Sequence, residues 1–357
     1  MDRIWGLETT IVIERMAYGG AGVGRLDDGR VCFVHGTLPG ERVLVHVYKA
    51  KKNFAEADLL EVLEASPRRI IPRCRVFGEC GGCSYQHADY AAQLEFKTAQ
   101  VSDVLRRIGG FQDVEVRPMI ASPLPWGYRN RISVHAEGGR VGFYHKKSHS
   151  LVDVKICPIA SEEVNAELNF LRDSRPRQDS RITLREPHAS RGFSQVNNGA
   201  AALLAGVVEE FAGSGQALVD AYCGAGFFSK RLRPRFEVVT GIEWSEAAIR
   251  HAREDASEKE TYLAGSVENH IAAVLGGVPL EQAALIVDPP AEGLSPDVVA
   301  AILDMPPQTL VYVSCDPSTF ARDAKKLSLK YKLDSVQPVD MFPQTAEIEL
   351  TARFLRI

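Results

Sequence analysis

Beyond about residue 193 the sequence alternates apolar, strand-like segments with helical segments, and this alternation restricts the fold more than any other feature. The segments A-L-V-D-A-Y, V-V-T-G-I-E, A-L-I-V-D-P-P and T-L-V-Y-V-S-C each read as a strand that runs into a polar residue. Strands that alternate with helices form a doubly wound parallel sheet, and such sheets bind ligands at the carboxyl ends of their strands. We therefore predict an α/β domain over residues 193–357 with a ligand site at that edge.

The front of the chain follows a different pattern. Between residues 8 and 64, short strands such as T-T-I-V-I-E-R and R-V-C-F-V-H are separated by the turn-like G-G-A-G-V-G and L-D-D-G-R, which predicts a small OB-like β-barrel. A helix is expected over residues 90–108, stopped by two glycines, and the middle of the chain reads as β-rich. We predict three domains, at residues 1–64, 65–192 and 193–357, with the 90–108 helix packing either in the middle domain or on the last.

Composition sets wider bounds. At 357 residues, the chain is longer than a typical domain with a single hydrophobic core. It contains no run of eighteen apolar residues, and its first residues lack the basic and then apolar order of a signal peptide. We therefore expect a cytoplasmic monomer with no membrane association. The net charge is only −4, but basic residues gather before residue 150, as at Arg129 and Arg131. These groups are either solvated surface or part of a basic front half that binds nucleic acid.

Four of the seven cysteines form a spaced set. Cys74, Cys80 and Cys83 read as C-x5-C-G-G-C, and Cys157 follows as C-P. In a reducing compartment such cysteines point to metal binding or catalysis rather than to disulfides. Four thiolates suit either a structural zinc ion or an iron–sulfur cluster, and the spacing alone does not separate the two.

A glycine turn follows the first strand of the α/β domain. The strand runs to Asp220, and Gly224 and Gly226 allow a tight turn that brings the backbone close to a ligand. Ser229 stands where the third glycine of the dinucleotide fingerprint belongs, so a phosphate-free nucleoside such as S-adenosylmethionine fits better. The next strand ends in Glu243, where an acidic residue accepts hydrogen bonds from the two ribose hydroxyls.

Two further strands deliver reactive side chains to the same edge. Asp288 follows A-L-I-V, and Ala291 after D-P-P removes the aromatic residue that methylases of exocyclic amines use to stack a base. Cys315 follows T-L-V-Y-V-S, and Pro317 is expected to start a helix whose positive end lowers the thiol pKa. A cysteine after an apolar strand is by itself more often a packed core residue.

These motifs together resemble the RNA uracil-5-methyltransferase family, over nearly the whole chain. The barrel is similar to an RNA-binding TRAM domain in G-G-A-G-V-G-R, V-H-G-T-L-P-G-E and V-L-E-A-S-P-R-R. The spacing of the four cysteines is similar to the family's 4Fe-4S site. D-x-Y-C-G-x-G-x-F and S-C-D-P-x-T-x-x-R-D match its cofactor and nucleophile motifs. The resemblance implies a Rossmann-like S-adenosylmethionine-dependent methyltransferase domain, a 4Fe-4S cluster and RNA as the partner, with ribosomal RNA favoured and transfer RNA the alternative.

The resemblance also implies residue roles. Cys315 is the nucleophile and Glu349 the base, while Cys74, Cys80, Cys83 and Cys157 hold the cluster. The cofactor-binding residues it implies are Gln195, Asp220, Tyr222, Gly224, Gly226, Phe227, Glu243, Ser266 and Asp288. Four positions differ from the family's usual residues: Phe227 replaces a small polar residue, Ser266 an asparagine, Ala291 an arginine and Glu347 a histidine.

The chemistry of uracil explains why a thiol and a base are needed. Carbon 5 is a poor nucleophile, so thiolate addition at carbon 6 must first raise its electron density, and a base must then remove the proton from carbon 5. The target uridine has to be flipped out of a stem or lie in a loop. Two alternatives stay open: an RNA-binding protein with a degenerate methyltransferase fold, and a methylase of another base atom such as carbon 5 of cytosine.

Overall fold

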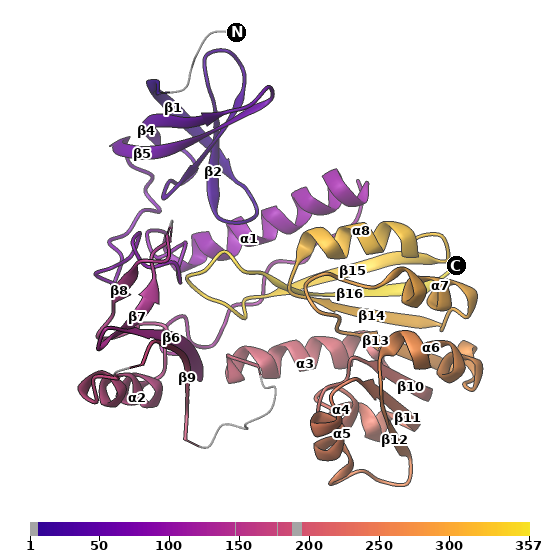
Figure 1. Cartoon of the computed structure of the whole chain (residues 1–357). Helices are drawn as coiled ribbons and strands as arrows, with labels where there is room; N and C mark the ends of the chain where they lie inside the picture. Colours follow the sequence, from indigo (N-terminus) through magenta and orange to yellow (C-terminus); the bar gives the residue numbers. More distant parts are fainter. Residues whose placement is uncertain (1–5, 147, 177, 188–194) are drawn as a thin grey trace. The chain divides into compact units, whose positions relative to one another are not determined.

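The structure, a computed structural model, describes residues 6–146, 148–176, 178–187 and 195–357 (Figure 1). The chain divides into two compact units: unit 1 comprises Met1–Gln100, Leu124–His188 and Phe342–Ala346, and unit 2 comprises Val101–Pro123, Ala189–Met341 and Glu347–Ile357. The expected boundary between residues 192 and 193 lies outside the described residues, and the division into three domains stays a prediction.

Unit 1 begins with a closed barrel of five strands, in the order β1-β2-β3-β5-β4. The strands are β1 (Glu8–Met16), β2 (Ala21–Arg25), β3 (Val31–His35), β4 (Arg42–Ala50) and β5 (Phe54–Glu64). Alternate residues such as Ile11, Ile13, Val43 and Val45 fill its core, which confirms the expected barrel.

One element of the barrel corrects the sequence prediction. Strand β2 occupies the glycine-rich segment that we expected to be a turn. A Cβ atom on Gly22 would lie 2.1 Å from the Thr37 hydroxyl, and one on Gly24 would lie 2.4 Å from the Val12 carbonyl oxygen. These glycines therefore allow β2 to approach its neighbouring segments closely. Because glycine is also common in turns, the same sequence reads as a turn.

A second sheet of unit 1 has four strands in the order β8-β7-β6-β9. Its elements are β6 (Arg131–Glu137), β7 (Arg140–Tyr144), β8 (Leu151–Asp153), α2 (Glu162–Asp173) and β9 (Ser180–Arg185). Ile132 and Val134 of β6 pack against Val164 and Leu168 of α2, so one face of the sheet is covered by the helix. The β-rich middle is confirmed, although α2 and β9 were not predicted.

The expected helix over residues 90–108 is confirmed. It consists of α1 (Tyr90–Val104) followed by one π-helical turn, η1 (Leu105–Gly109), and ends at Gly110, which has a φ of 79°. The boundary between the two units passes within α1. In unit 1, Gln93 of α1 exchanges two hydrogen bonds of 3.0 Å with Gln344, which fixes the segment that contains Gln344.

Unit 2 is built on a seven-stranded sheet in the order β12-β11-β10-β13-β14-β16-β15. Its strands are β10 (Gly215–Ala221), β11 (Phe236–Glu243), β12 (Glu260–Ala264), β13 (Ala283–Val287), β14 (Thr309–Ser314), β15 (Tyr331–Val339) and β16 (Glu349–Arg356). Its helices are α3 (Asn198–Ala212), α4 (Ser229–Leu232), η2 (Arg233–Arg235), α5 (Glu246–Arg253), α6 (Val267–Gly276), η3 (Leu280–Gln282), α7 (Pro296–Asp304) and α8 (Pro317–Leu327). In Figure 1, α3 and α8 lie on opposite sides of the sheet.

The order of the strands determines where a ligand can bind. Strands β10 to β14 are parallel, and the connections run outward in opposite directions from β10 and β13, which are neighbours. A crevice forms outside the carboxyl ends at such a switch point. All five residues of β13 are buried, as expected for a strand covered by helices on both faces. The predicted doubly wound α/β domain is therefore confirmed.

None of the helices in the described residues is long and apolar enough to cross a membrane.

Candidate active site

Three neighbouring strands bring the predicted reactive residues to one edge of the sheet. β13 and β14 are parallel, and Asp288 and Cys315 each follow the last residue of their strand. β16 runs antiparallel to β14, with Ser314 opposite Leu350. Cys315 and Glu349 are the next pair in this register, and residues in that relation have Cα atoms about 4.5–5.5 Å apart with side chains on one face. The predicted nucleophile and base therefore lie side by side.

Cys315 is exposed, as a nucleophile must be. Its thiol nevertheless sits in a partly desolvated edge, and this desolvation, with the charges of Glu349 and Asp288, raises its pKa to about 11. The expected lowering of the pKa was wrong. Helix α8 does begin at Pro317, but the Asp316 carboxylate caps it, accepting hydrogen bonds from the Ser318 and Thr319 amides at 2.7 and 3.0 Å. That negative charge offsets the positive end of the helix.

Three carboxyl groups at this edge repel one another. Burial raises the pKa of Asp220 to about 7, and burial together with the charge of Asp220 raises the pKa of Asp288 to about 7. Glu349 is buried, and burial and Asp288 raise its pKa well above the usual value. One Asp220 oxygen accepts a 3.0 Å hydrogen bond from the Ser229 amide, and the other has no partner among the described residues. A cationic ligand would relieve this repulsion.

The glycine turn has the tight geometry that we expected. Gly224 and Gly226 have φ angles of 55° and 85°, and Tyr222 adopts a left-handed conformation with a φ of 67°. Such a conformation is costly for a side chain as large as tyrosine and is found mostly at functional sites. Glu243 accepts hydrogen bonds from the Gly224 amide at 3.2 Å and the Ser245 amide at 2.8 Å, so its carboxylate ties the turn to the start of α5.

Three further predicted cofactor residues are Phe227, Ser266 and Gln195. Phe227 is 44% exposed, and its ring lies 5.0 Å from that of Phe228. Ser266 occupies the N-cap position of α6, where its side chain makes no capping hydrogen bond. Gln195 precedes α3, and the two residues before it lie outside the described residues.

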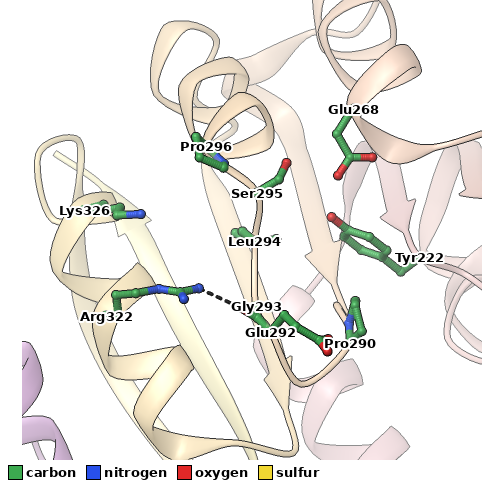
Figure 2. Close-up of a pocket in the computed structure, with 10 residues that line it drawn as sticks. All are labelled: Tyr222, Glu268, Pro290, Glu292, Gly293, Leu294, Ser295, Pro296, Arg322 and Lys326. Atoms are coloured by element: carbon green, nitrogen blue, oxygen red, sulfur yellow. Dashed lines mark hydrogen bonds between the residues drawn. The ribbon is translucent and has the colours of Figure 1, made fainter.

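A cavity of about 360 Å³ opens beside the turn (Figure 2). Such a volume is in the range of small-molecule sites. Of the predicted site residues, Tyr222 lines it, and in Figure 2 its hydroxyl points toward Glu268. Its other lining residues are Pro290, Glu292, Gly293, Leu294, Ser295, Pro296, Arg322 and Lys326.

Asp323 is a residue of this region whose role the sequence reasoning missed. Its carboxylate is fully buried and accepts hydrogen bonds from the Leu294 amide at 2.8 Å and the Tyr312 hydroxyl at 3.0 Å. It thereby holds the loop that follows Asp288 against β14 and α8. A signal existed, because Asp323 is the last residue of the S-C-D-P-x-T-x-x-R-D motif.

In unit 1 the four predicted cysteine ligands come from two loops. The first loop is pinned to the end of β7, because the Gly81 amide donates to the Tyr144 carbonyl at 3.1 Å. The Cys157 loop is held by Asn165 of α2, whose side chain accepts from the Cys157 amide at 2.8 Å and donates to its carbonyl at 3.1 Å. Hydrogen bonds therefore fix both loops.

The four thiols influence one another. Burial raises the pKa of Cys80 to about 11, and Cys157 and Cys74 raise it further. Burial likewise raises the pKa of Cys83 to about 12, against a hydrogen bond from the buried Gln86 side chain. Across the described ranges, no three histidine, cysteine or acidic side chains converge tightly enough for a single metal ion. Four sulfurs that gather with only cysteines as donors nevertheless suit a larger, thiophilic group.

Comparisons with known proteins agree with this geometry. The TRAM domain family matches residues 6–60, and the tRNA (uracil-5-)-methyltransferase family matches residues 275–356. A relative from Gloeobacter violaceus, described as an uncharacterized RNA methyltransferase, is 32% identical over 98% of this chain and 97% of its own. A relative from Bdellovibrio bacteriovorus with the same description is 32% identical over 97% of this chain and 95% of its own.

A solved structure extends the likeness to the fold of the whole chain. The crystal structure of Pyrococcus abyssi tRNA (uracil-54, C5)-methyltransferase in complex with S-adenosyl-L-homocysteine has a TM-score of 0.73 and 25% sequence identity to this chain. The match covers 97% of this chain and all of the Pyrococcus chain. The expected family and its TRAM domain are confirmed: this protein is a TRAM-containing member of the RNA (uracil-5-)-methyltransferase family.

Proposed function

We propose that the protein methylates carbon 5 of a specific uridine in RNA, with S-adenosylmethionine as the methyl donor and Cys315 as a covalent nucleophile. The observation that supports this proposal is the register of β14 and β16, whose last pair is Ser314 and Leu350, the residues next to Cys315 and Glu349. A thiol beside a buried carboxyl, at the ligand-binding edge of a doubly wound sheet, provides both groups that methylation of carbon 5 requires.

The carboxyl cluster supports the choice of donor. S-adenosylmethionine carries a positive sulfonium, and Asp220 and Asp288 are carboxyls whose raised pKa a bound cation would lower. The oxygen of Asp220 that has no partner among the described residues is an acceptor for a ligand donor. Gly224 and Gly226 shape the turn around the nucleoside, and Glu243 accepts from its ribose. Tyr222, Phe227, Ser266 and Gln195 complete the proposed set, and the related Pyrococcus enzyme was crystallised with S-adenosyl-L-homocysteine.

The residues of the chain then act in three steps. The Cys315 thiolate adds to carbon 6 of the uracil, and the electron pair of the 5,6 double bond moves toward carbon 5. When bound, S-adenosylmethionine supplies the methyl group that carbon 5 takes up. Glu349 then removes the remaining proton from carbon 5, the double bond reforms, and the bond between Cys315 and carbon 6 breaks. Cys315 leaves as a thiolate, and because its pKa is raised it takes up a proton from water before the next cycle.

We infer ribosomal RNA as the substrate, read in part by the TRAM barrel, in the cytoplasm and by a monomer. Transfer RNA is the second candidate, and a specific observation favours it: the Pyrococcus relative, which matches 97% of this chain, is named for transfer RNA. Mapping of 5-methyluridine by mass spectrometry, in ribosomal and transfer RNA from cells with and without the gene, tests both. A single site lost from ribosomal RNA supports the first candidate, and one lost from transfer RNA replaces it with the second.

A methyl-transfer assay on RNA from the deletion cells tests the chemistry. We expect methylation by the wild-type protein and none by Cys315→Ala. Full activity in the alanine variant would exclude the covalent route. A wild-type protein that binds no S-adenosylmethionine in calorimetry would instead identify an RNA-binding protein with a degenerate fold, and 5-methylcytidine as product would identify a different target atom.

We further propose that Cys74, Cys80, Cys83 and Cys157 hold a 4Fe-4S cluster, because their thiols gather in one place and carry the family's spacing. Protein purified without oxygen should be brown and contain about four iron atoms per chain. Replacing Cys80 with serine should remove the colour, whereas replacing Cys32, a buried core residue of the barrel, should not. Colourless protein with one zinc ion would overturn the proposal.

A further inference from the structure

Helix α2 packs against one face of the four-stranded sheet of unit 1 and leaves the other face uncovered by that helix. Ile132, Val134 and Ala136 of β6 belong to the apolar core under α2, together with Leu184 of β9. Because successive side chains of a strand point to opposite faces, the intervening residues must lie on the other side. We call this the outer sheet face. On β6 and the neighbouring edge strand β9 its residues are Arg131, Ser133, His135, Arg181, Thr183 and Arg185.

The register of β6 and β9 arranges these six residues in three rungs. Arg131 lies opposite Arg185, Ser133 opposite Thr183, and His135 opposite Arg181. Directly opposite residues have neighbouring side chains, and successive rungs on one face are about 6.6–6.8 Å apart. The Ser133 and Thr183 hydroxyls are 3.0 Å apart. The outer sheet face therefore presents a row of hydrogen-bond donors in which arginines hold three of six positions.

At one end of this row, Arg131 and Arg185 lie directly opposite each other. Like charges placed directly opposite in a sheet destabilise it, and Arg131 and Arg185 are such a pair. Burial and the charges of Arg185 and Arg129 lower the pKa of Arg131. The Nη1 atom of Arg185 is buried and has no hydrogen-bond partner among the described residues. A buried charged donor without a partner costs free energy, which the guanidinium regains by turning toward an anion.

Aromatic rings continue the face at its other end. The His135 and Tyr144 rings are stacked, with centroids 3.7 Å apart and planes at 19°. His149 meets Tyr144 edge to face at 5.3 Å. Two acidic groups also lie at the end that carries His135. Glu137 is hydrogen-bonded to Tyr144, and Asp179 accepts a hydrogen bond of 3.2 Å from the Gly138 amide. The end that carries Arg131 and Arg185 is thus the one suited to an anion.

We propose that the outer sheet face binds the phosphate backbone of the RNA substrate, with Arg131 and Arg185 on neighbouring phosphates. This inference rests on the proposed function for the identity of the partner as RNA, but not on the chemistry of Cys315. Guanidinium groups form paired hydrogen bonds with phosphate, and such contacts position a nucleic acid without reading its sequence. A phosphate at this end gives the Arg185 Nη1 atom an acceptor and screens the two like charges from each other, and each phosphate contact adds to the salt dependence of binding.

The test compares full-length protein with the variant Arg131→Gln/Arg185→Gln. Binding of a fluorescein-labelled oligouridylate of twenty nucleotides is measured by anisotropy between 50 and 300 mM KCl. For a single strand the slope of log K against log salt is about −0.7 per phosphate contact, so we expect the slope to fall by about 1.4 and affinity at low salt by roughly tenfold. The variant with lysine at both positions should keep most of the slope, because lysine also binds phosphate.

The matched control removes one charge from unit 2. Arg235→Gln breaks a surface ion pair with Glu209 at the amino end of β11 and should leave the slope unchanged. Calorimetry with S-adenosylmethionine checks that every variant is folded, and kinetics should show a raised KM for RNA with an unchanged kcat. Equal slopes for the double variant and Arg235→Gln would overturn the proposal. If the double variant has a reduced slope but the wild-type protein methylates no uridine, RNA binding by the outer sheet face is supported and the proposed methylation is rejected.

Discussion

The charge of Glu349 raises the pKa of Cys315, and the two residues adjoin Leu350 and Ser314, the last pair of β16 and β14. The two side chains are 34 positions apart in the sequence and one strand apart in the sheet. Asp288, on the other neighbouring strand, adds a second carboxyl to the thiol's surroundings.

Replacing Glu349 with glutamine should trap the enzyme on its RNA. The variant can still add Cys315 to carbon 6, but it lacks the base that removes the proton from carbon 5, so the thiol cannot leave. We expect turnover to fall by about 10²–10⁴-fold, and a slower-migrating RNA–protein band to appear on a denaturing gel. Glu347→Gln, two residues earlier in the E-I-E-L segment, is the matched control and should give no such band. The band should also vanish when Cys315→Ala is added to Glu349→Gln.

Alkylation of Cys315 should accelerate steadily with pH. Because its pKa is raised to about 11, the thiolate fraction of the free protein grows about tenfold per pH unit between pH 7 and 10. The rate of iodoacetamide labelling, followed by mass spectrometry of the peptide that contains Cys315, should follow that slope. Glutathione in the same buffers serves as the comparison with an ordinary thiol. A rate that levels off below pH 8 would show that the end of α8 controls the thiol after all.

Binding of S-adenosylmethionine should release protons. Asp220 and Asp288 have pKa values near 7 in the free protein, so each is about half protonated at pH 7. A bound cation lowers both values, so binding should release up to about one proton at pH 7 and weaken as the pH falls below that value. Calorimetry in buffers of different ionisation enthalpy measures the release. S-adenosylhomocysteine, which lacks the sulfonium charge, should release fewer protons. Equal affinities at pH 5.5 and 8 would contradict this electrostatic account.

Replacing Asp323 with asparagine should loosen the loop that follows Asp288. One oxygen of its buried carboxylate accepts from the Leu294 amide and the Tyr312 hydroxyl, and the other accepts from Arg322 Nε. An uncharged amide has only one acceptor oxygen, so it loses one side of this arrangement and the ion pair with Arg322. We expect the free energy of unfolding to fall by about 1–3 kcal/mol, measured by urea denaturation. Asp304→Asn, an exposed carboxyl at the end of α7, should change it by less than about 0.5 kcal/mol. No loss in Asp323→Asn would show that the loop is held by other contacts.

Sequence patterns were sufficient to place Asp288, Glu243 and Cys315 at strand ends, because each follows an apolar run that only a buried strand explains. Their contacts were not predictable in the same way. The pairing of β14 with β16 joins distant segments, so the neighbour of Cys315 came from a family resemblance rather than from local pattern. The cap formed by Asp316 and the charges of Asp288 and Glu349 depend on side-chain placement, and for that reason the direction of the thiol pKa was wrong.

In the barrel, too, contacts between distant segments could not be predicted from the local sequence. Strand β2 has a sequence that favours a turn, and only the closeness of Thr37 and Val12 explains its glycines. Asp323 was visible as a motif residue, but its hydrogen bonds to Leu294 and Tyr312 join three separate segments of the chain.

The protonated state of Cys315 also has a chemical consequence for the idle enzyme. Thiolates rather than thiols attack peroxides and disulfides, so a thiol with a pKa of about 11 reacts only slowly with such oxidants. Under the proposed function, the raised pKa keeps the exposed Cys315 sulfur of the free enzyme mostly protonated, so this nucleophile resists oxidation without being buried.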